Sequence, residues 1–184
     1  EKASERLGVN TDRLMENAGM AVAEVTREIM GGAAGNRVAV LAGPGNNGAD
    51  GFVAARHLGR WGAEVTVCLL TKRPEIDSRL EAARRYGVAV IDFSTGSEDL
   101  APVLQRSKVV IDAVLGIGRA RPLGGMVQEA SRLLSEYRTA GFGPQVLSID
   151  LPTGVNSDTG MADPSRFTAD VTVALGYPKA GLLN

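Results

Sequence analysis

The chain has 184 residues, of which 44% are hydrophobic and 22% are charged, and its formal net charge is −1. This length allows one well-buried globular core and is too short for two ordinary domains. The balanced charge gives no indication of a nucleic-acid or membrane surface, and no apolar stretch is long enough to span a bilayer. The single cysteine, Cys68, cannot form an internal disulfide. We therefore expect a reducing, cytoplasmic location, although the missing initial Met leaves open a targeting segment ahead of residue 1.

The first predicted element is an amphipathic helix over residues 11–30. One helical face carries apolar side chains, namely Leu14, Ala18, Ala21, Val22 and Val25. Asn10 or Thr11 is the candidate cap at the start of this helix, and Gly31 and Gly32 are expected to end it.

After this helix, short apolar runs alternate with helical patterns. The runs predict strands at 38–42, 65–70, 88–91, 109–111, 146–149 and 171–175. The segments between them predict helices near 51–61, 78–86, 100–106 and 126–138. Strands rich in Val and Ile, without polar alternation, are typical of a sheet covered on both faces. The sequence therefore predicts a single α/β domain: a doubly wound, Rossmann-like, three-layer fold with a mostly parallel sheet.

The segment 43–51, with the sequence GPGNNGADG, lies between a predicted strand and a predicted helix. A glycine-rich turn at such a junction directs backbone N–H groups and the positive end of the helix at an anion, usually a phosphate. Its G-x-G-x-x-G spacing also fits the dinucleotide fingerprint, which alone is a weak signal. A loop that only cradles phosphate needs no Asn46, Asn47 or Asp50, so we expect further chemistry here.

Three aspartates, Asp50, Asp112 and Asp150, follow predicted strands. Carboxyl ends of parallel strands meet at one edge of the sheet, which is where ligands bind in this fold class. Gathered carboxylates raise one another's pKa unless a hard cation or a donor such as Arg119 or Arg121 neutralises them. Taken singly, Asp50 is explained by capping the next helix and the other two by bonding loop amides. Taken together, they favour a binding site.

Other enzyme classes fit the sequence less well. A conventional NAD site has an acidic residue at the end of the second strand, where this chain has Lys72 and Arg73. That basic pair is either an acceptor for a 2′-phosphate or a solvated turn. With His57 as the one histidine, which we expect to be structural and partly exposed, a zinc site or a Cys–His dyad is excluded. Ser148 lacks the flanking glycines of a hydrolase nucleophile.

Several ordered motifs are shared with one known family. They are Met15-Glu-Asn-Ala-Gly19, Gly45-Asn-Asn-Gly-Ala-Asp-Gly51, Ala54-Ala-Arg-His-Leu58, Asp112-Ala-Val-Leu-Gly116, Arg121-Pro122 with Gly124, Ser148-Ile-Asp-Leu-Pro-Thr-Gly154 and Lys179-Ala-Gly-Leu182. On these motifs the chain resembles the NAD(P)HX epimerase family, also called the YjeF N-terminal-domain family, which includes the apolipoprotein A-I-binding protein. The resemblance spans nearly the whole chain, so we assign residues 1–184 to one such domain.

The resemblance implies an isomerase that interconverts the R and S epimers of hydrated NADH and NADPH (NADHX and NADPHX). A partner dehydratase, specific for the S form, then restores the cofactor. Asp150 and Asp50 are the implied acid–base residues. The implied substrate-binding residues are Asn46, Asn47, Gly48, Ala49, Asp50, Gly116, Ile117, Gly118, Arg119, Ala120, Arg121, Pro122 and Asp150. One potassium ion per subunit is implied to be held by Asn47, Asp112 and Thr153, and a homodimer is expected.

Three positions depart from the family pattern. Ala49 replaces a usual glycine and requires a negative φ; Thr153 replaces a serine and keeps its hydroxyl; Asn156 replaces an acidic residue. The chain stops soon after Lys179, before the family's final strand, which leaves open a fused dehydratase domain in a longer parent chain. Two alternatives also stay open: a non-catalytic scaffold or protein-binding module of the same fold, and an NADP-dependent oxidoreductase.

Overall fold

The computed structural model describes residues 10–73, 77–96, 99–117 and 122–183. Its elements, in chain order, are α2 (Thr11–Met30), β1 (Arg37–Ala42), α3 (Asn46–Arg60), β2 (Glu64–Leu69), α4 (Ser78–Arg84), β3 (Ala89–Asp92), α5 (Ala101–Arg106), β4 (Val109–Ala113), α6 (Gly125–Thr139), β5 (Gln145–Ile149), β6 (Val171–Val173) and the short 3₁₀ turn η1 (Ala180–Leu182). Within these ranges the strands form one sheet in the order β3-β2-β1-β4-β5-β6, and every pairing is parallel. The doubly wound fold is confirmed, and the sheet is parallel throughout.

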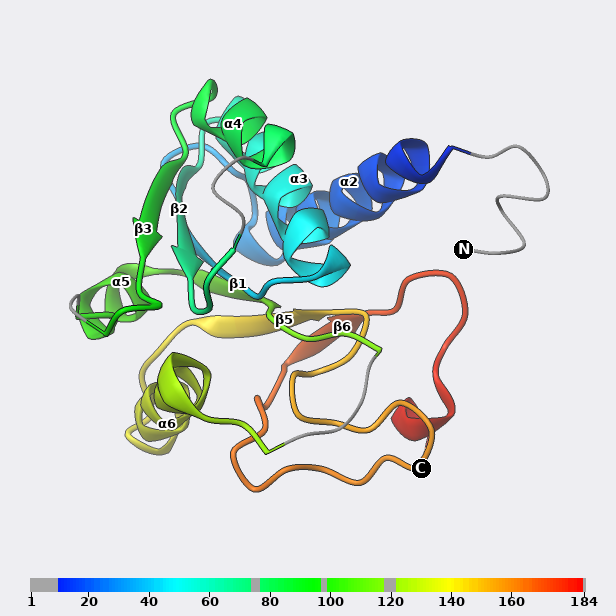
Figure 1. Ribbon diagram of the computed structural model, residues 1–184. Coiled ribbons are helices and arrows are strands. Elements are labelled where there is room, and N and C mark those ends of the chain that lie inside the picture. The colour runs from blue at the N-terminus through cyan, green and yellow to red at the C-terminus, as the bar shows by residue number, and fades with distance from the viewer. Residues whose placement is uncertain (1–9, 74–76, 97–98, 118–121, 184) are drawn as a thin grey trace.

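Helices cover both faces of the sheet, giving three layers (Figure 1). Helices α2, α3 and α4 lie on one face, where Val38 and Val40 of β1 join their core. Helices α5 and α6 lie on the other, where Ala39 and Leu41 join a second core. Both faces of β1 are therefore buried, which explains why its sequence shows no polar alternation. Within the described ranges, no helix combines the length and apolar character needed to cross a membrane.

The boundaries of α2 agree with the prediction. The Asn10 side chain accepts a hydrogen bond from the Asp12 N–H at 2.8 Å, and Gly31 ends the helix with a left-handed φ of 68°. The predicted start of α3 at residue 51 is wrong, because the helix begins at Asn46. Asp50 is therefore the fifth residue of α3 and does not cap it. Glycines and asparagines have low helix propensity, which hid this first turn in the sequence.

Helix α2 packs directly on α3. A Cβ placed on Gly19 of α2 would lie 2.6 Å from Val53 Cγ1 and 2.9 Å from the Asp50 carbonyl oxygen, so Gly19 permits the close approach. His57 of α3 is 6% exposed, and its Nε2 lies 2.8 Å from Glu16 Oε1 of α2. The expectation of a partly exposed histidine is therefore wrong, because α2 covers it.

We expect Gly19→Ala to destabilise the protein by about 1–3 kcal/mol, because the added methyl group meets α3. At an exposed helical glycine the same substitution would stabilise the protein, since alanine has the higher helix propensity. Urea unfolding measures the effect, with the exposed Asn17→Ala on the same helix as the control. Equal or greater stability of Gly19→Ala would contradict this account of the α2–α3 contact.

Candidate active site

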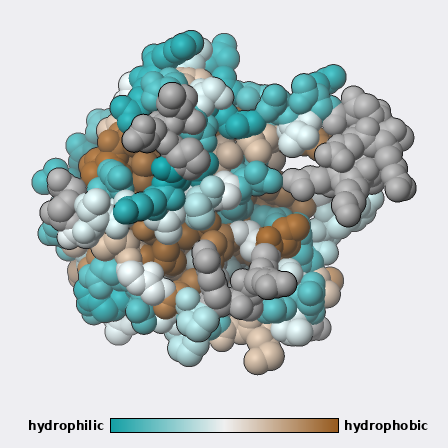
Figure 2. All heavy atoms as spheres, in the orientation of Figure 1, coloured by the Kyte–Doolittle hydropathy of each residue, from teal (hydrophilic) through white to brown (hydrophobic). Residues whose placement is uncertain are grey.

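A pocket of about 960 Å³ opens at the carboxyl ends of the central strands. Its walls come from the start of α3, the loops that follow β4 and β5, and the C-terminal segment. Ile117 and Met161 line it and are 66% and 76% exposed, so apolar surface is available to a ligand. Figure 2 shows hydrophobic residues exposed in the middle of the face that Figure 1 presents, between the α2–α4 layer and the half that contains α6.

The structure brings most of the described candidate residues together. Those that line the pocket are Asn46, Asn47, Asp50, Gly116, Ile117, Pro122 and Asp150. Gly118, Arg119, Ala120 and Arg121 lie outside the described residues. Two candidates, Gly48 and Ala49, are buried beside the pocket and do not line it.

Gly48 and Ala49 lie behind the pocket wall, in the first turn of α3. A Cβ on Gly48 would lie 2.3 Å from the backbone carbonyl oxygen of Gly43 and 2.6 Å from a guanidinium nitrogen of Arg73, so a larger residue has no room. Ala49 is 5% exposed and packs with Met15 and Val53. Its φ is negative, which is the condition that its replacement of a glycine requires. Both residues therefore position the pocket wall.

Asp150 has an unusual backbone. Its φ is 68°, which makes it the one non-glycine residue with a left-handed φ in the part of the chain that the structure describes. Aspartate tolerates this conformation better than most residues. The Asp150 N–H donates to the Val173 carbonyl oxygen at 2.8 Å, so the neighbouring strand β6 fixes the turn. The turn directs a 7%-exposed carboxylate into the pocket wall.

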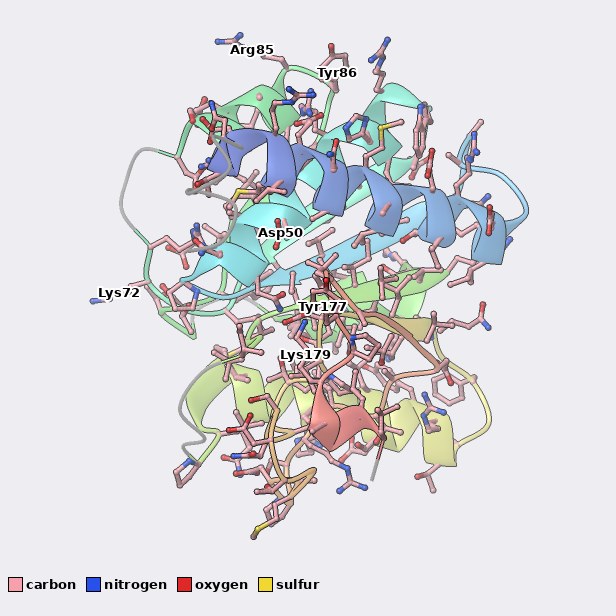
Figure 3. The ribbon with its side chains drawn as sticks, turned by 90° about the vertical axis from the view of Figure 1, so that its right-hand side faces the viewer. Asp50, Lys72, Arg85, Tyr86, Tyr177 and Lys179 are labelled. Atoms are coloured by element: carbon pink, nitrogen blue, oxygen red, sulfur yellow. The ribbon has the colours of Figure 1, made fainter. Side chains whose placement is uncertain are left out.

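Lys179 is the site residue that sequence reasoning missed. Its ammonium forms an ion pair with Asp150 Oδ1 and donates to the Leu175 carbonyl oxygen at 2.7 Å. The Leu175 N–H donates to the same Oδ1 at 3.2 Å. In Figure 3, Asp50 lies on α3 and Lys179 on the C-terminal segment, so the two halves of the fold both contribute charged groups. Lys179 belongs to one of the motifs shared with the family, but the spacing of that motif does not indicate that Lys179 pairs with Asp150.

The second oxygen of Asp150 points toward the loop after β4. A Cβ on Gly116 would lie 3.6 Å from Asp150 Oδ2 and 3.4 Å from Asn47 Oδ1. The amide nitrogen of Asn47 is buried and has no hydrogen-bond partner. A buried polar group of this kind is rare in folded proteins and indicates an unfilled contact. Asp150, Asn47 and the space over Gly116 therefore form one polar corner of the pocket.

Asp112 lies deeper, beneath this corner, and is fully buried. Its Oδ1 accepts from Thr153 Oγ1 at 2.6 Å and from the Val114 N–H at 3.2 Å, and its Oδ2 accepts from Ser148 Oγ and the Thr153 N–H at 2.8 Å each. Burial raises the pKa of Asp112, and these hydrogen bonds partly oppose that rise. All of these partners are uncharged.

The residues around Asp112 suit a hard cation. Carboxylate, hydroxyl and amide oxygens are the ligands that such ions prefer, and a buried carboxylate with neutral partners lacks a balancing charge. The four donors fill the four acceptor positions of the carboxylate. Thr153 Oγ1 also lies 3.4 Å from the Leu115 carbonyl oxygen, so its hydroxyl hydrogen has an alternative acceptor and can release Asp112 Oδ1.

The basic pair after β2, Lys72 and Arg73, does not form a phosphate site in the structure. Lys72 is exposed and points into solvent (Figure 3). The Arg73 side chain is 8% exposed and forms an ion pair with Asp77 at 2.9 Å. The oxidoreductase alternative therefore loses Arg73 as an acceptor for a 2′-phosphate, and Lys72 does not line the pocket.

Residues 11–181 match the family described as YjeF-related protein N-terminus. The chain belongs to this family. It is 38% identical to the bifunctional NAD(P)H-hydrate repair enzyme Nnr of Thermofilum pendens, over 99% of this chain and 34% of that protein. It is 36% identical to the NAD(P)H-hydrate epimerase of Rhodopirellula baltica, over 91% of this chain and 66% of that protein. The chain thus spans about a third of the bifunctional relatives.

A solved structure agrees with the fold. The crystal structure of the yeast protein ynu0 matches with a TM-score of 0.80 and 27% identity, covering 97% of this chain and 76% of that one.

We expect Thr153→Val to destabilise the protein by about 1.5–3 kcal/mol, because the buried Asp112 carboxylate loses its shortest hydrogen bond. Thr153→Ser keeps the hydroxyl and is the matched control, losing only a buried methyl group. Urea unfolding compares the two variants with the unmodified protein. If Thr153→Val is no less stable than Thr153→Ser, the hydroxyl does not support Asp112.

Proposed function

We propose that this chain is an NAD(P)H-hydrate epimerase, which interconverts the R and S epimers of hydrated NADH and NADPH. The observation that carries the proposal is the carboxylate of Asp150, held by Lys179 and by a left-handed backbone at the polar corner of a large pocket. Relatives that bear this activity in their names support it over most of the chain. A non-catalytic scaffold has no need of a constrained carboxylate in an open pocket.

The pocket suits a dinucleotide in size and chemistry. Its volume of about 960 Å³ lies at the upper end of the range for small-molecule sites. The N-terminus of α3 and the amides of Asn46 and Asn47 offer hydrogen-bond donors to phosphate groups. Ile117 and Met161 offer apolar surface to a ring. We also assign Gly118, Arg119, Ala120 and Arg121 to substrate binding, on the family resemblance alone.

Asp150 is the proposed general acid and base. In the state that carries a proton on Oδ2, the oxygen not paired with Lys179, it donates that proton to the hydroxyl on the hydrated ring while the ring nitrogen's electron pair expels that group as water. The C–O bond breaks and a planar cation remains, which the nearby carboxylates stabilise. Water then adds to either face and returns the proton to Asp150, so the two epimers interconvert. Asp50, which lines the same pocket, is the second candidate for this role.

Lys179 is a positioning residue for this step. Because its ammonium and the Leu175 N–H both contact Oδ1, they leave Oδ2 as the oxygen directed at Gly116 and Asn47. The proton therefore moves at Oδ2. Loss of Lys179 would free the carboxylate to rotate.

A potassium ion, if bound, would be held by Asn47, Asp112 and Thr153. The chemistry that it would supply is charge balance for the buried Asp112, together with orientation of the Asn47 amide toward the pocket. The epimerisation itself needs no step on the metal.

The bifunctional relatives support a dehydratase as the functional partner, fused in the same polypeptide. The dehydratase would consume the S epimer that this domain supplies. The homodimer and the cytoplasmic location stay predictions.

We expect this protein to convert purified R-NADPHX into the S epimer well above the spontaneous rate, measured by chromatographic separation of the two. Asp150→Asn should lower kcat by about 10²–10⁴-fold, because the acid–base group is lost. Asparagine also tolerates the left-handed φ at this position, so the backbone turn should survive.

The matched control is Asp158→Asn, an exposed aspartate in the next loop that does not line the pocket. It should keep full activity. If the folded, unmodified protein does not accelerate epimerisation, the epimerase proposal is wrong and the scaffold alternative stands. If Asp150→Asn keeps full activity while Asp50→Asn loses it, the acid–base role belongs to Asp50.

We expect K⁺ to stabilise the protein relative to Na⁺ at equal ionic strength, by about 1 kcal/mol or more once K⁺ is several-fold above its Kd. Urea unfolding in the two chloride salts measures this difference. Thr153→Val should abolish it, because one oxygen ligand is removed. Equal stability of the unmodified protein in both salts would rule out the proposed ion.

A further inference from the structure

Arg73, which follows β2, reaches across to the glycine-rich loop between β1 and α3. Its Nη1 donates to the carbonyl oxygen of Gly43 and, at 3.3 Å, to that of Gly45. Its Nη2 donates to Asp77 Oδ2 at 2.9 Å. The guanidinium carbon lies 4.7 Å from the ring centroid of Phe52, so the charged plane stacks on α3. One buried side chain therefore connects this loop, α3 and the start of α4.

The partners of Arg73 explain why it stays in place. Asp77 balances its charge, and the same carboxylate caps α4 by accepting from the Arg79 N–H at 3.0 Å. Phe52 is fully buried, so the surface under the guanidinium is fixed. Gly48 has no Cβ to collide with the guanidinium, which lets Arg73 lie against the first turn of α3.

The contacts of Arg73 determine which way the loop faces. Gly43 and Gly45 turn their carbonyl oxygens toward the guanidinium. No side chain caps α3, because its N-cap residue is Gly45. The first N–H groups of a helix have no partner within it, and here this end of the helix borders the pocket. A carbonyl oxygen turned into the pocket would repel a phosphate, whereas the helix end attracts it.

We propose that Arg73 is a positioning residue for substrate binding: it holds the Gly43 and Gly45 carbonyls away from the pocket and so presents the start of α3 to the phosphate groups of the substrate. Arg73 itself does not touch the substrate. This inference rests on the proposed function for its choice of ligand. It predicts that Arg73 affects the affinity for NADHX and for NADPHX equally, whether or not the substrate carries a 2′-phosphate.

Kinetics of Arg73→Met on both hydrated cofactors test the proposal. We expect KM to rise about tenfold or more, and by the same factor for NADHX and NADPHX, with kcat changed less than about twofold. Arg73→Lys should behave like Arg73→Met, because an ammonium cannot span two carbonyls and a carboxylate while stacking on a ring. The matched control is Lys72→Met, which removes the neighbouring exposed charge and should change neither constant.

Three outcomes would overturn the proposal. A KM increase confined to NADPHX would mean that Arg73 contacts the 2′-phosphate. Full rescue by Arg73→Lys would mean that charge alone matters. A fall in kcat with unchanged KM would place the effect in the chemical step.

Hydrogen exchange separates this inference from the proposed function. Amide exchange at Ala49 and Asp50, in the first turns of α3, should be faster in Arg73→Met than in Lys72→Met. This holds even if the unmodified protein turns over neither substrate, in which case only the epimerase proposal fails. Unchanged exchange in both variants would show that Arg73 does not hold the loop, and the inference would be wrong.

Discussion

The position of helix α3 against the sheet is the constraint on which the site depends. A Cβ on Gly51 would lie 2.7 Å from the Cβ of Ala113 in β4, and a Cβ on Gly43 would lie 2.7 Å from the backbone carbon of Val114. Such distances are below those of real contacts, so α3 and the loop before it can come this close to Ala113 and Val114 only with glycine at these two points. The close approach brings Asn47 and Asp50 over the end of β4. Gly51, which lowers the helix propensity of α3, thus permits the approach that places the side chains of the candidate site.

Two of the buried carboxylates at the site, Asp112 and Asp150, are held in different ways. Asp150 is balanced by the ammonium of Lys179, which comes from the C-terminal segment. None of the groups that donate hydrogen bonds to Asp112 is charged, and burial raises the pKa of this carboxyl. A carboxylate paired with a fixed cation can point one oxygen into a pocket and keep its orientation. A carboxylate with only neutral donors is suited to take a mobile cation from solvent.

The sequence was sufficient to predict the sheet, because all six apolar runs form strands whose ends lie within two residues of the predicted ones. The signal is strongest in β1 and β4, which are buried on both faces. The sequence also predicted that Asp50, Asp112 and Asp150 would lie at one edge of the sheet, because the apolar runs before them predict parallel strands. In the structure Asp112 is the fourth residue of β4 and Asp50 lies in α3. The sequence could not predict that Lys179 pairs with Asp150, because a contact across 29 positions of chain leaves no local pattern. The burial of His57 was missed for the same reason: α2 covers it, and helix periodicity does not reveal what packs on the outer face.

The left-handed backbone of Asp150 links the order of the strands to the position of the proposed acid–base carboxylate. β5 and β6 are neighbours, and after Ile149 the chain turns so that the Asp150 N–H still reaches the Val173 carbonyl oxygen at 2.8 Å. A residue of positive φ at this point directs its side chain off the line of the strand. Leu175 and Lys179 lie on the segment after β6, so the pairing of these two strands also brings both partners of Oδ1 to the carboxylate. Removing β6 from the sheet would therefore release the backbone turn and both contacts at once, which makes the edge strand part of the candidate active site.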